Sequence, residues 1–166
     1  MDRKPKVAVV MGSDSDLPVV KKCIDALKKF EIDVDVNVIS AHRTPYEAES
    51  FAKSADKNGF EVIIAAAGKA AHLGGVLAAY TTLPVIGIPI KSSTMDGLDS
   101  LLSMVQMSKG IPVATVAIDG AENAGILAAQ ILALKYDNIA KLLIKHKEDM
   151  ANEVNEKNRK LKEELK

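Results

Sequence analysis

Two segments of this 166-residue chain place a histidine shortly after a run of apolar residues. In the first, SAHRTP (residues 40–45) follows the alternating run VDVNVI and sets His42 beside Arg43. An imidazole has an ordinary pKa of about 6.5, which suits proton transfer near neutral pH. A guanidinium group can hold a phosphate or a carboxylate through two parallel hydrogen bonds. The pair predicts proton transfer on an anionic ligand; the alternative is an incidental loop histidine beside a surface cation.

The second segment is EVIIAAAG followed by KAAHL, which places His72 after two alanines. For His72 a purely structural role is the stronger interpretation. A half-buried histidine at the start of a helix can serve only to donate a hydrogen bond to a backbone carbonyl. The third histidine, His146, lies in a charge-dense segment, and we expect it to be solvated or to lie at an interface.

A third polar segment, GSDSD (12–16), follows the apolar run KVAVVM. Gly12 suits a tight turn, Ser13 and Ser15 supply hydroxyls, and Asp14 and Asp16 supply carboxylates. Backbone N–H groups at such a turn suit a phosphate, and carboxylates commonly fix ribose hydroxyls. The alternative is a simple turn in which Asp16 caps the following helix.

These segments must be positioned by the elements around them. Short apolar runs rich in β-branched residues predict strands at 6–11, 34–39, 61–66, 84–89 and 111–118. Between them, apolar residues at helical spacing predict helices at 17–30, from 44, after 72, at 99–107 and at 121–134. This alternation predicts a parallel sheet with right-handed crossovers, hence a three-layer α/β/α sandwich of the flavodoxin-like kind. Ligands of such sheets bind beyond the carboxyl ends of the strands, where the three polar segments lie.

The sequence also predicts where one helix begins and how the chain ends. TPYE predicts an N-cap at Thr44, with Pro45 at the first helical position and Glu47 as the capping-box partner. From 136 onward a sparse apolar stripe among many charges predicts a C-terminal helical tail (136–166) that packs on a neighbouring subunit or along the domain. We expect one domain, 1–166, with this tail.

Composition narrows the function classes. The 22 basic residues balance the 22 acidic ones, so nothing favours a nucleic-acid partner or a membrane surface. Aromatic residues make up 4% and Trp is absent, which weakens flavin or base stacking. Cys23 lies among helix formers and is expected to be a core residue in a reducing compartment. The longest apolar run, 62–67, is far shorter than a membrane span. We therefore expect a cytoplasmic protein.

Several longer motifs occur in a fixed order between Val7 and Leu134: VMGSDSD, SAHRTP, AAHL, TLPVIGIP, GLDSLLSMVQM, GIPVATVAI and NAGILAAQIL. With these motifs the chain resembles the PurE family of purine biosynthesis. The resemblance implies a mutase that moves a carboxylate from the exocyclic nitrogen of an aminoimidazole ribonucleotide to a ring carbon. It implies loss and recapture of CO2, no metal, biotin or ATP, and a homo-octamer.

The resemblance also implies roles for individual positions. Ser13 and Asp16 would hold the 5′-phosphate and ribose hydroxyls, with Asp14 in the same pocket. His42 would shuttle the proton between nitrogen and carbon, and Arg43 would bind at the phosphate end. The remaining implied substrate-binding residues are Ser40, Ala41, Gly68, Lys69, Ala71, His72 and Leu73, of which the last five form a loop around the carboxylate.

Two positions depart from the family pattern AGGAAHLPG. This chain reads AGKAAHLGG, so Lys69 stands where the family has glycine and Gly74 where it has proline. A large residue at 69 resembles a second branch of the family, which carboxylates the aminoimidazole ribonucleotide directly with CO2. The other matches favour the mutase, and direct carboxylation stays open as the alternative. Lys69 either stabilises a bound anion or points toward solvent from a loop that accepts substitutions.

Other classes fit less well. A response-regulator receiver domain needs an acceptor aspartate after the third strand, where this chain has AAAG. A dehydrogenase needs G-x-G-x-x-G after the first strand, which MGSDSDLP does not supply. A non-enzymatic flavodoxin-like nucleotide-binding module is the more distant alternative, and a colourless purified protein would argue against bound flavin.

Overall fold

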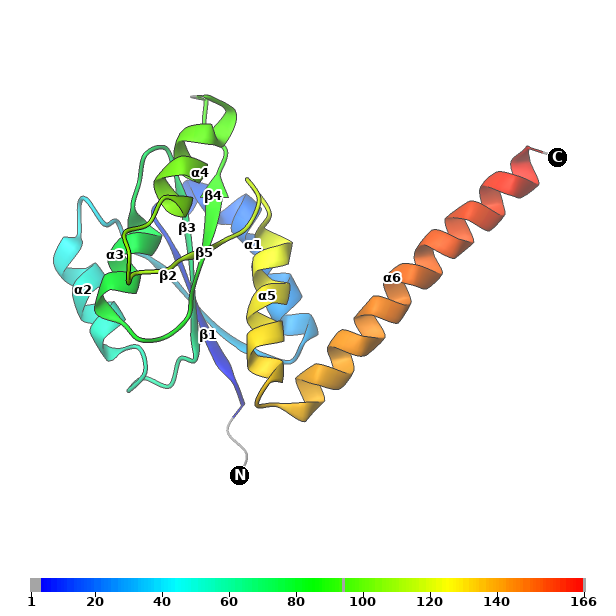
Figure 1. Ribbon diagram of the computed structural model, residues 1–166, viewed down its shortest axis with the longest axis horizontal. Helices are drawn as coiled ribbons and strands as arrows, with labels where there is room; N and C mark the ends of the chain where they lie inside the picture. The colour runs from blue at the N-terminus through cyan, green and yellow to red at the C-terminus, as the bar shows by residue number, and fades with distance from the viewer. Residues whose placement is uncertain (1–3, 94, 166) are drawn as a thin grey trace.

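The computed structural model describes residues 4–93 and 95–165. Residues 1–3, 94 and 166, which the predicted domain and tail include, lie outside the described part. Five parallel strands form one sheet in the order β2-β1-β3-β4-β5 (Figure 1). The strands are β1 Lys6–Met11, β2 Asp33–Val38, β3 Val62–Gly68, β4 Val85–Ile90 and β5 Ala114–Thr115.

Helices cover both faces of the sheet, because successive side chains of each buried strand point to opposite sides. In β1, Val7 and Val9 pack on the side of α1 and α5, whereas Ala8 and Val10 pack toward α2 and α3. The helices are α1 Leu17–Lys29, α2 Pro45–Ser54, α3 Leu73–Tyr80, α4 Leu98–Val105, α5 Ala121–Ala133 and α6 Asp137–Glu164. The predicted three-layer sandwich is therefore confirmed.

Helices α1 and α5 approach closely because small residues line their contact. A Cβ added at Gly125 would lie 2.9 Å from the carbonyl oxygen of Cys23 and from the Cβ of Ala26. Cys23 is buried there, and burial raises the pKa of its thiol to about 12. The expectation that Cys23 is a core residue is confirmed.

The predicted fifth strand, 111–118, is much shorter in the structure. Only Ala114–Thr115 pairs as a strand, opposite Ile86 and Gly87 of β4. The chain then stays near β4 through single hydrogen bonds from the Val116 amide to the Gly87 carbonyl and from the Asp119 amide to the Pro89 carbonyl. This segment is at the edge of the sheet and half exposed, so its β-branched sequence does not extend the ladder.

Helix α6 is 28 residues long and leaves the sandwich at an angle (Figure 1). Its first turns pack on α5 and bury Ile139, while Met150 and Val154 are exposed farther along. The first turns of α6 therefore lie against the domain, and the later turns extend away from it (Figure 1). No helix among residues 4–93 and 95–165 is long and apolar enough to cross a membrane.

Candidate active site

The order of the strands fixes where a cleft opens. From β1 the chain moves to β2 on one side and then to β3 on the other, so the loops after β1 and β3 diverge at the carboxyl edge. A cleft of about 780 Å³ lies there. It is lined by the last residues of β3 and β4 and by residues that follow the four strands β1 to β4: Gly12, Ser13, Ser15, Asp16, Val19, Ser40, Ala41, His42, Arg43, Ala67, Gly68, Lys69, Ala70, Ala71, Leu73, Ile90, Lys91 and Ser92.

The segment after β1 forms a compact turn. The Gly12 amide donates to the Ala66 carbonyl at 3.0 Å, and a short 3-10 helix, Asp14–Asp16, leads into α1. The Ser13 hydroxyl accepts a hydrogen bond from the Ser15 amide at 3.3 Å and lies 2.8 Å from the Ser15 hydroxyl. Two hydroxyls are thus held side by side at the cleft.

Asp16 lies at the N-terminus of α1, but its carboxylate makes no capping hydrogen bond among the described residues. Its side chain therefore does not act as a simple helix cap. Burial raises its pKa above the ordinary 3.8, and the charges of Asp119 and Asp14 add to this rise. A hydrogen bond with the Ser13 backbone opposes it. The carboxylate is therefore kept facing the cleft at an electrostatic cost.

The segment after β2 is a turn closed by Thr44. Its amide donates to the Ser40 carbonyl at 2.8 Å, and its hydroxyl donates to the same carbonyl at 2.9 Å. The Ser40 amide donates back to the Thr44 hydroxyl at 3.0 Å. The prediction that Thr44 precedes α2 is confirmed, whereas the predicted capping box with Glu47 is wrong, because this hydroxyl serves the preceding turn.

The turn presents His42 and Arg43 to the cleft, and both side chains are exposed. The Ser40 hydroxyl accepts from the Arg43 amide at 3.2 Å and lies 3.5 Å from Arg43 Nε. The terminal nitrogens of the guanidinium therefore remain available to an anionic ligand.

The segment after β3 carries an unusual backbone conformation. Lys69 has φ 58°, in the left-handed region that favours glycine. Just before it, Gly68 is not required by space, since an added Cβ would lie 3.4 Å from the Ile90 carbonyl oxygen and 3.7 Å from the Ile90 Cβ. Gly74 is not required by space, since an added Cβ would make ordinary contacts at 3.5 Å with Val113 and 3.7 Å with Ala65.

A profile of the family described as AIR carboxylase matches residues 6–153. The chain belongs to the AIR carboxylase family. Relatives named N5-carboxyaminoimidazole ribonucleotide mutase include one from Pyrococcus abyssi, 60% identical over 146 residues, covering 88% of this chain and 84% of that protein. Another, from Thermotoga maritima, is 55% identical over 159 residues, covering 96% and 93%.

Other similar proteins carry a different name or a known structure. A phosphoribosylaminoimidazole carboxylase from Candida glabrata is 55% identical over 141 residues, 84% of this chain but 25% of that longer protein. The crystal structure of Treponema denticola PurE has a TM-score of 0.88 at 30% identity and covers 96% of this chain and 99% of that one. The AIR carboxylase fold thus spans nearly the whole chain.

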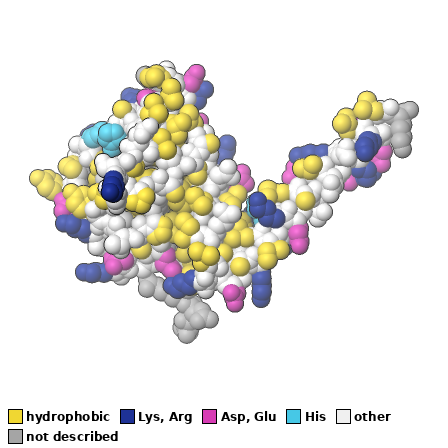
Figure 2. All heavy atoms as spheres, in the orientation of Figure 1, with side chains coloured by type: hydrophobic (Ala, Val, Ile, Leu, Met, Phe, Trp, Pro, Cys, Tyr) yellow, Lys and Arg dark blue, Asp and Glu magenta, His cyan; other side chains and the backbone are white. Residues whose placement is uncertain are grey.

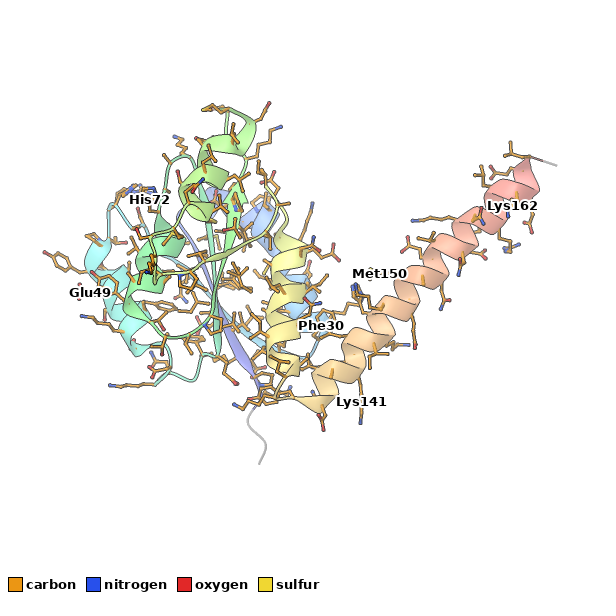
Figure 3. The ribbon with its side chains drawn as sticks, viewed as in Figure 1. Phe30, Glu49, His72, Lys141, Met150 and Lys162 are labelled. Atoms are coloured by element: carbon orange, nitrogen blue, oxygen red, sulfur yellow. The ribbon has the colours of Figure 1, made fainter. Side chains whose placement is uncertain are left out.

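Within this AIR carboxylase-family cleft, most of the predicted site residues come together. Asp14 is exposed and does not line the cleft, nor does His72. His72 precedes α3 and lies at the outer surface of the sandwich (Figure 3). The interpretation of His72 as a half-buried structural residue is wrong, because its ring is exposed and bonds no carbonyl of the described residues.

Sequence reasoning missed the residues contributed by β4. Lys91 and Ser92 line the cleft directly after this strand. The segment IKSSTMDGLDS reads only as a polar loop, and the signal that identifies it is its position after a buried strand, the same rule that selected the other three segments.

His146 is not solvated, which excludes one of the two environments expected for it. It is 8% exposed, its Nδ1 lies 3.2 Å from Lys29 Nζ, and its ring meets Phe30 edge to face with centroids 5.6 Å apart. Figure 3 places Phe30 where α6 approaches the sandwich. Burial arises because the first turns of α6 pack against α1 and α5, far from the cleft.

The charged residues of the cleft define the ligand that it suits. They are one carboxylate, one imidazole and three cations: Asp16, His42, Arg43, Lys69 and Lys91. The excess of cations favours an anionic ligand, and the paired serine hydroxyls add neutral donors. Within residues 4–93 and 95–165 no group of three or more His, Cys, Asp or Glu side chains is arranged to hold a metal ion.

Proposed function

We propose that this chain converts N5-carboxyaminoimidazole ribonucleotide to 4-carboxy-5-aminoimidazole ribonucleotide in purine biosynthesis, with His42 as the proton shuttle. The main support is sequence identity to two proteins named as this mutase, 60% for the Pyrococcus abyssi protein and 55% for the Thermotoga maritima protein, across nearly the whole chain. The cleft supports the proposal because it combines an imidazole with several cations, which suits a substrate bearing a phosphate and a carboxylate.

The nucleotide is held by the loops after β1 and β2. The hydroxyl of Ser13 and the carboxylate of Asp16 bind the phosphate and ribose hydroxyls, and Arg43 completes the phosphate end. The loop after β3 surrounds the base and its carboxylate. Further substrate-binding residues in this proposal are Asp14, Ser40, Ala41, Gly68, Lys69, Ala71, His72 and Leu73. Asp14 and His72 do not line the cleft, so they would contact a part of the ligand, or a neighbouring subunit, outside it.

His42 acts in two proton transfers. The bond between the exocyclic nitrogen and its carboxylate breaks, releasing CO2, and imidazolium protonates the nitrogen. The ring carbon, made electron-rich by the freed amine, attacks CO2 and forms the new carbon–carbon bond. The imidazole then takes the proton from that carbon, so one proton moves from carbon to nitrogen and the shuttle is restored.

The walls of the cleft suit the retention of CO2. Buried or half-buried apolar side chains line it between the polar loops, namely Ala41, Ala67, Ala71 and Leu73. A bound nucleotide closes such a space to water, and the short-lived CO2 then meets the ring carbon before it escapes.

Direct carboxylation of aminoimidazole ribonucleotide is the second candidate. It is favoured by Lys69, whose cation lines the cleft at a position where the family pattern has glycine. The name of the Candida glabrata relative, phosphoribosylaminoimidazole carboxylase, is compatible with either reaction of this domain within a longer protein.

Assembly into a homo-octamer and a cytoplasmic location are parts of the proposal. The outer face of α4 supports assembly because Leu98, Leu102 and Val105 are each more than two-fifths exposed there. Figure 2 shows hydrophobic side chains gathered at this end of the molecule. By contrast, most of the small-residue face of α5 is already covered by α1, so α5 has less to offer a neighbour.

The experiment compares two substrate arms on purified protein without ATP. One arm offers the N-carboxylated nucleotide, and the other offers the uncarboxylated nucleotide with bicarbonate at modest concentration. Product from the first arm alone supports the mutase, and product from the second alone supports direct carboxylation. Product from neither arm contradicts both.

A further inference from the structure

Two lysines follow neighbouring strands at matching positions. Gly68 ends β3 and pairs with Ile90, which ends β4, and the next residues are Lys69 and Lys91. Both lysines line the cleft. The parallel register therefore brings two cations to the same part of the carboxyl edge.

Lys69 is held in a conformation that its side chain does not favour. Its φ of 58° puts a non-glycine residue in the left-handed region at the cleft. Within the described part of the chain, its ammonium makes no hydrogen bond or ion pair. A side chain that is exposed, charged and unpaired at a strained backbone position is a candidate for ligand binding.

The backbone of Lys91 is held in place, whereas the ion pair of its side chain is exposed to solvent. Its amide donates to Asp119 Oδ1 at 2.8 Å, which anchors the main chain. Its ammonium lies 3.2 Å from Asp96 Oδ1, but the two side chains are 55% and 89% exposed. Such an exposed ion pair contributes little, so a ligand anion can replace Asp96 at small cost.

The opposite end of the cleft carries the other cation. Arg43 follows β2, and three strand spacings separate β2 from β4 in the sheet. At about 4.8 Å per spacing, the two strand exits lie about 14 Å apart. The cleft therefore has two separated positive ends, and the excess of charge is larger at the exits of β3 and β4.

We propose that Lys69 and Lys91 form a second anion subsite, which binds the carboxylate of the aminoimidazole nucleotide while Arg43 binds its phosphate. This inference rests on the proposed function. It assigns to Lys91 a role that the family pattern did not indicate, and it gives Lys69 a defined ligand group. Together the two lysines distinguish carboxylated from uncarboxylated nucleotides.

The test measures binding of two nucleotides by calorimetry. One is 4-carboxy-5-aminoimidazole ribonucleotide, and the other is 5-aminoimidazole ribonucleotide, which lacks the carboxylate. Lys69→Gln and Lys91→Gln each remove one charge, and we expect each to weaken binding of the carboxylated nucleotide roughly tenfold. Binding of the uncarboxylated nucleotide should not change. Lys69→Arg should restore the preference, and Lys109→Gln, on an exposed turn outside the cleft, is the matched control.

The outcomes separate this inference from the function on which it rests. Equal weakening for both nucleotides, or no weakening for either, overturns the carboxylate subsite while the wild-type enzyme still turns over. If the wild-type protein binds neither nucleotide and forms no product, the proposed function itself fails. Thermal unfolding of each variant, expected to match wild type at these exposed sites, excludes a folding defect as the cause.

Discussion

The hydroxyl of Thr44 exchanges hydrogen bonds with the main chain of Ser40, accepting from its amide at 3.0 Å and donating to its carbonyl at 2.9 Å. The amide of Thr44 adds a third bond to the same carbonyl at 2.8 Å. His42 and Arg43 lie within the turn that these bonds close. Thr44 is thus a positioning residue for the proposed proton shuttle, and it does not itself line the cleft.

Replacing Thr44 with valine keeps the shape of the side chain and removes its hydroxyl. We expect kcat to fall roughly tenfold or more, because a small displacement of a catalytic group is costly. Stability should fall by only about 1 kcal/mol, the net contribution of such a hydrogen bond. Steady-state kinetics and thermal unfolding measure the two effects. Thr44→Ser should restore most of the rate, and an equal loss in the serine variant would argue against the role of the hydroxyl.

Replacing His42 with asparagine removes the proposed proton shuttle from a side chain that is exposed in the cleft. We expect kcat to fall by about 10²–10⁴, the usual contribution of general acid–base catalysis. Affinity for the product nucleotide, measured by calorimetry, should stay close to wild type, because the phosphate and ribose contacts remain. A variant that turns over at near-normal rate would contradict the mechanism.

Asp16 gives a prediction with a defined dependence on pH. Its pKa is raised in the folded state, chiefly by burial, so its favourable contribution to stability is complete below the ordinary 3.8. That contribution is lost as the pH rises through the folded value, and an ionised Asp16 opposes folding at neutral pH. Asp16→Asn should therefore unfold at a higher temperature than wild type at pH 7, and the difference should narrow below about pH 4.

The same variant separates stability from binding. If Asp16 binds the ribose or phosphate end as proposed, Asp16→Asn weakens nucleotide affinity roughly tenfold while it stabilises the fold. A variant that is less stable at pH 7, measured by thermal unfolding across the pH range, would show that the carboxylate has favourable partners.

Replacing Lys69 with glycine relieves the backbone at φ 58°. We expect a gain of up to about 1 kcal/mol, since the left-handed conformation costs side-chain-bearing residues roughly that amount beyond the entropy lost by glycine. For a chain of this size the midpoint of thermal unfolding should rise by about 2–4 °C.

Glu31→Gly is the matched control for this effect. Glu31 has φ 60°, is exposed, and follows the C-terminal end of α1 at a position where helices favour glycine. Both variants should gain stability, and only Lys69→Gly should lose preference for the carboxylated nucleotide. No gain in either variant would mean that other contacts compensate the backbone.

The buried strands were predictable because both faces of a parallel sheet are covered. The apolar run at 6–11 coincides with β1, and the runs at 61–66 and 84–89 differ from β3 and β4 by a residue or two. The edge segment at 111–118 has the same composition but pairs on one side only, and its half-exposed backbone forms two residues of ladder. The amino-acid composition of a segment therefore does not predict whether it pairs with other strands on one side or on both.

The site was predictable to the extent that it follows from strand exits. The segments after β1, β2 and β3 were identified because each combines small and ionisable residues after an apolar run. Lys91 was missed because its loop has no distinctive motif, and only the pairing of β4 with β3 places it in the cleft. The contact that buries His146 could not be predicted for a similar reason, since it depends on how α6 meets Phe30 in the folded chain.

The outer strand β2 has a consequence for the behaviour of the protein at high concentration. It is six residues long, and one of its long sides is open to solvent in the chain alone, a geometry that can recruit further strands into aggregates. Its sequence, DVDVNV, alternates Asp33 and Asp35 with valines that are exposed or half exposed. Parallel, in-register stacking of two such edges would bring like charges together, so the carboxylates protect solubility at neutral pH.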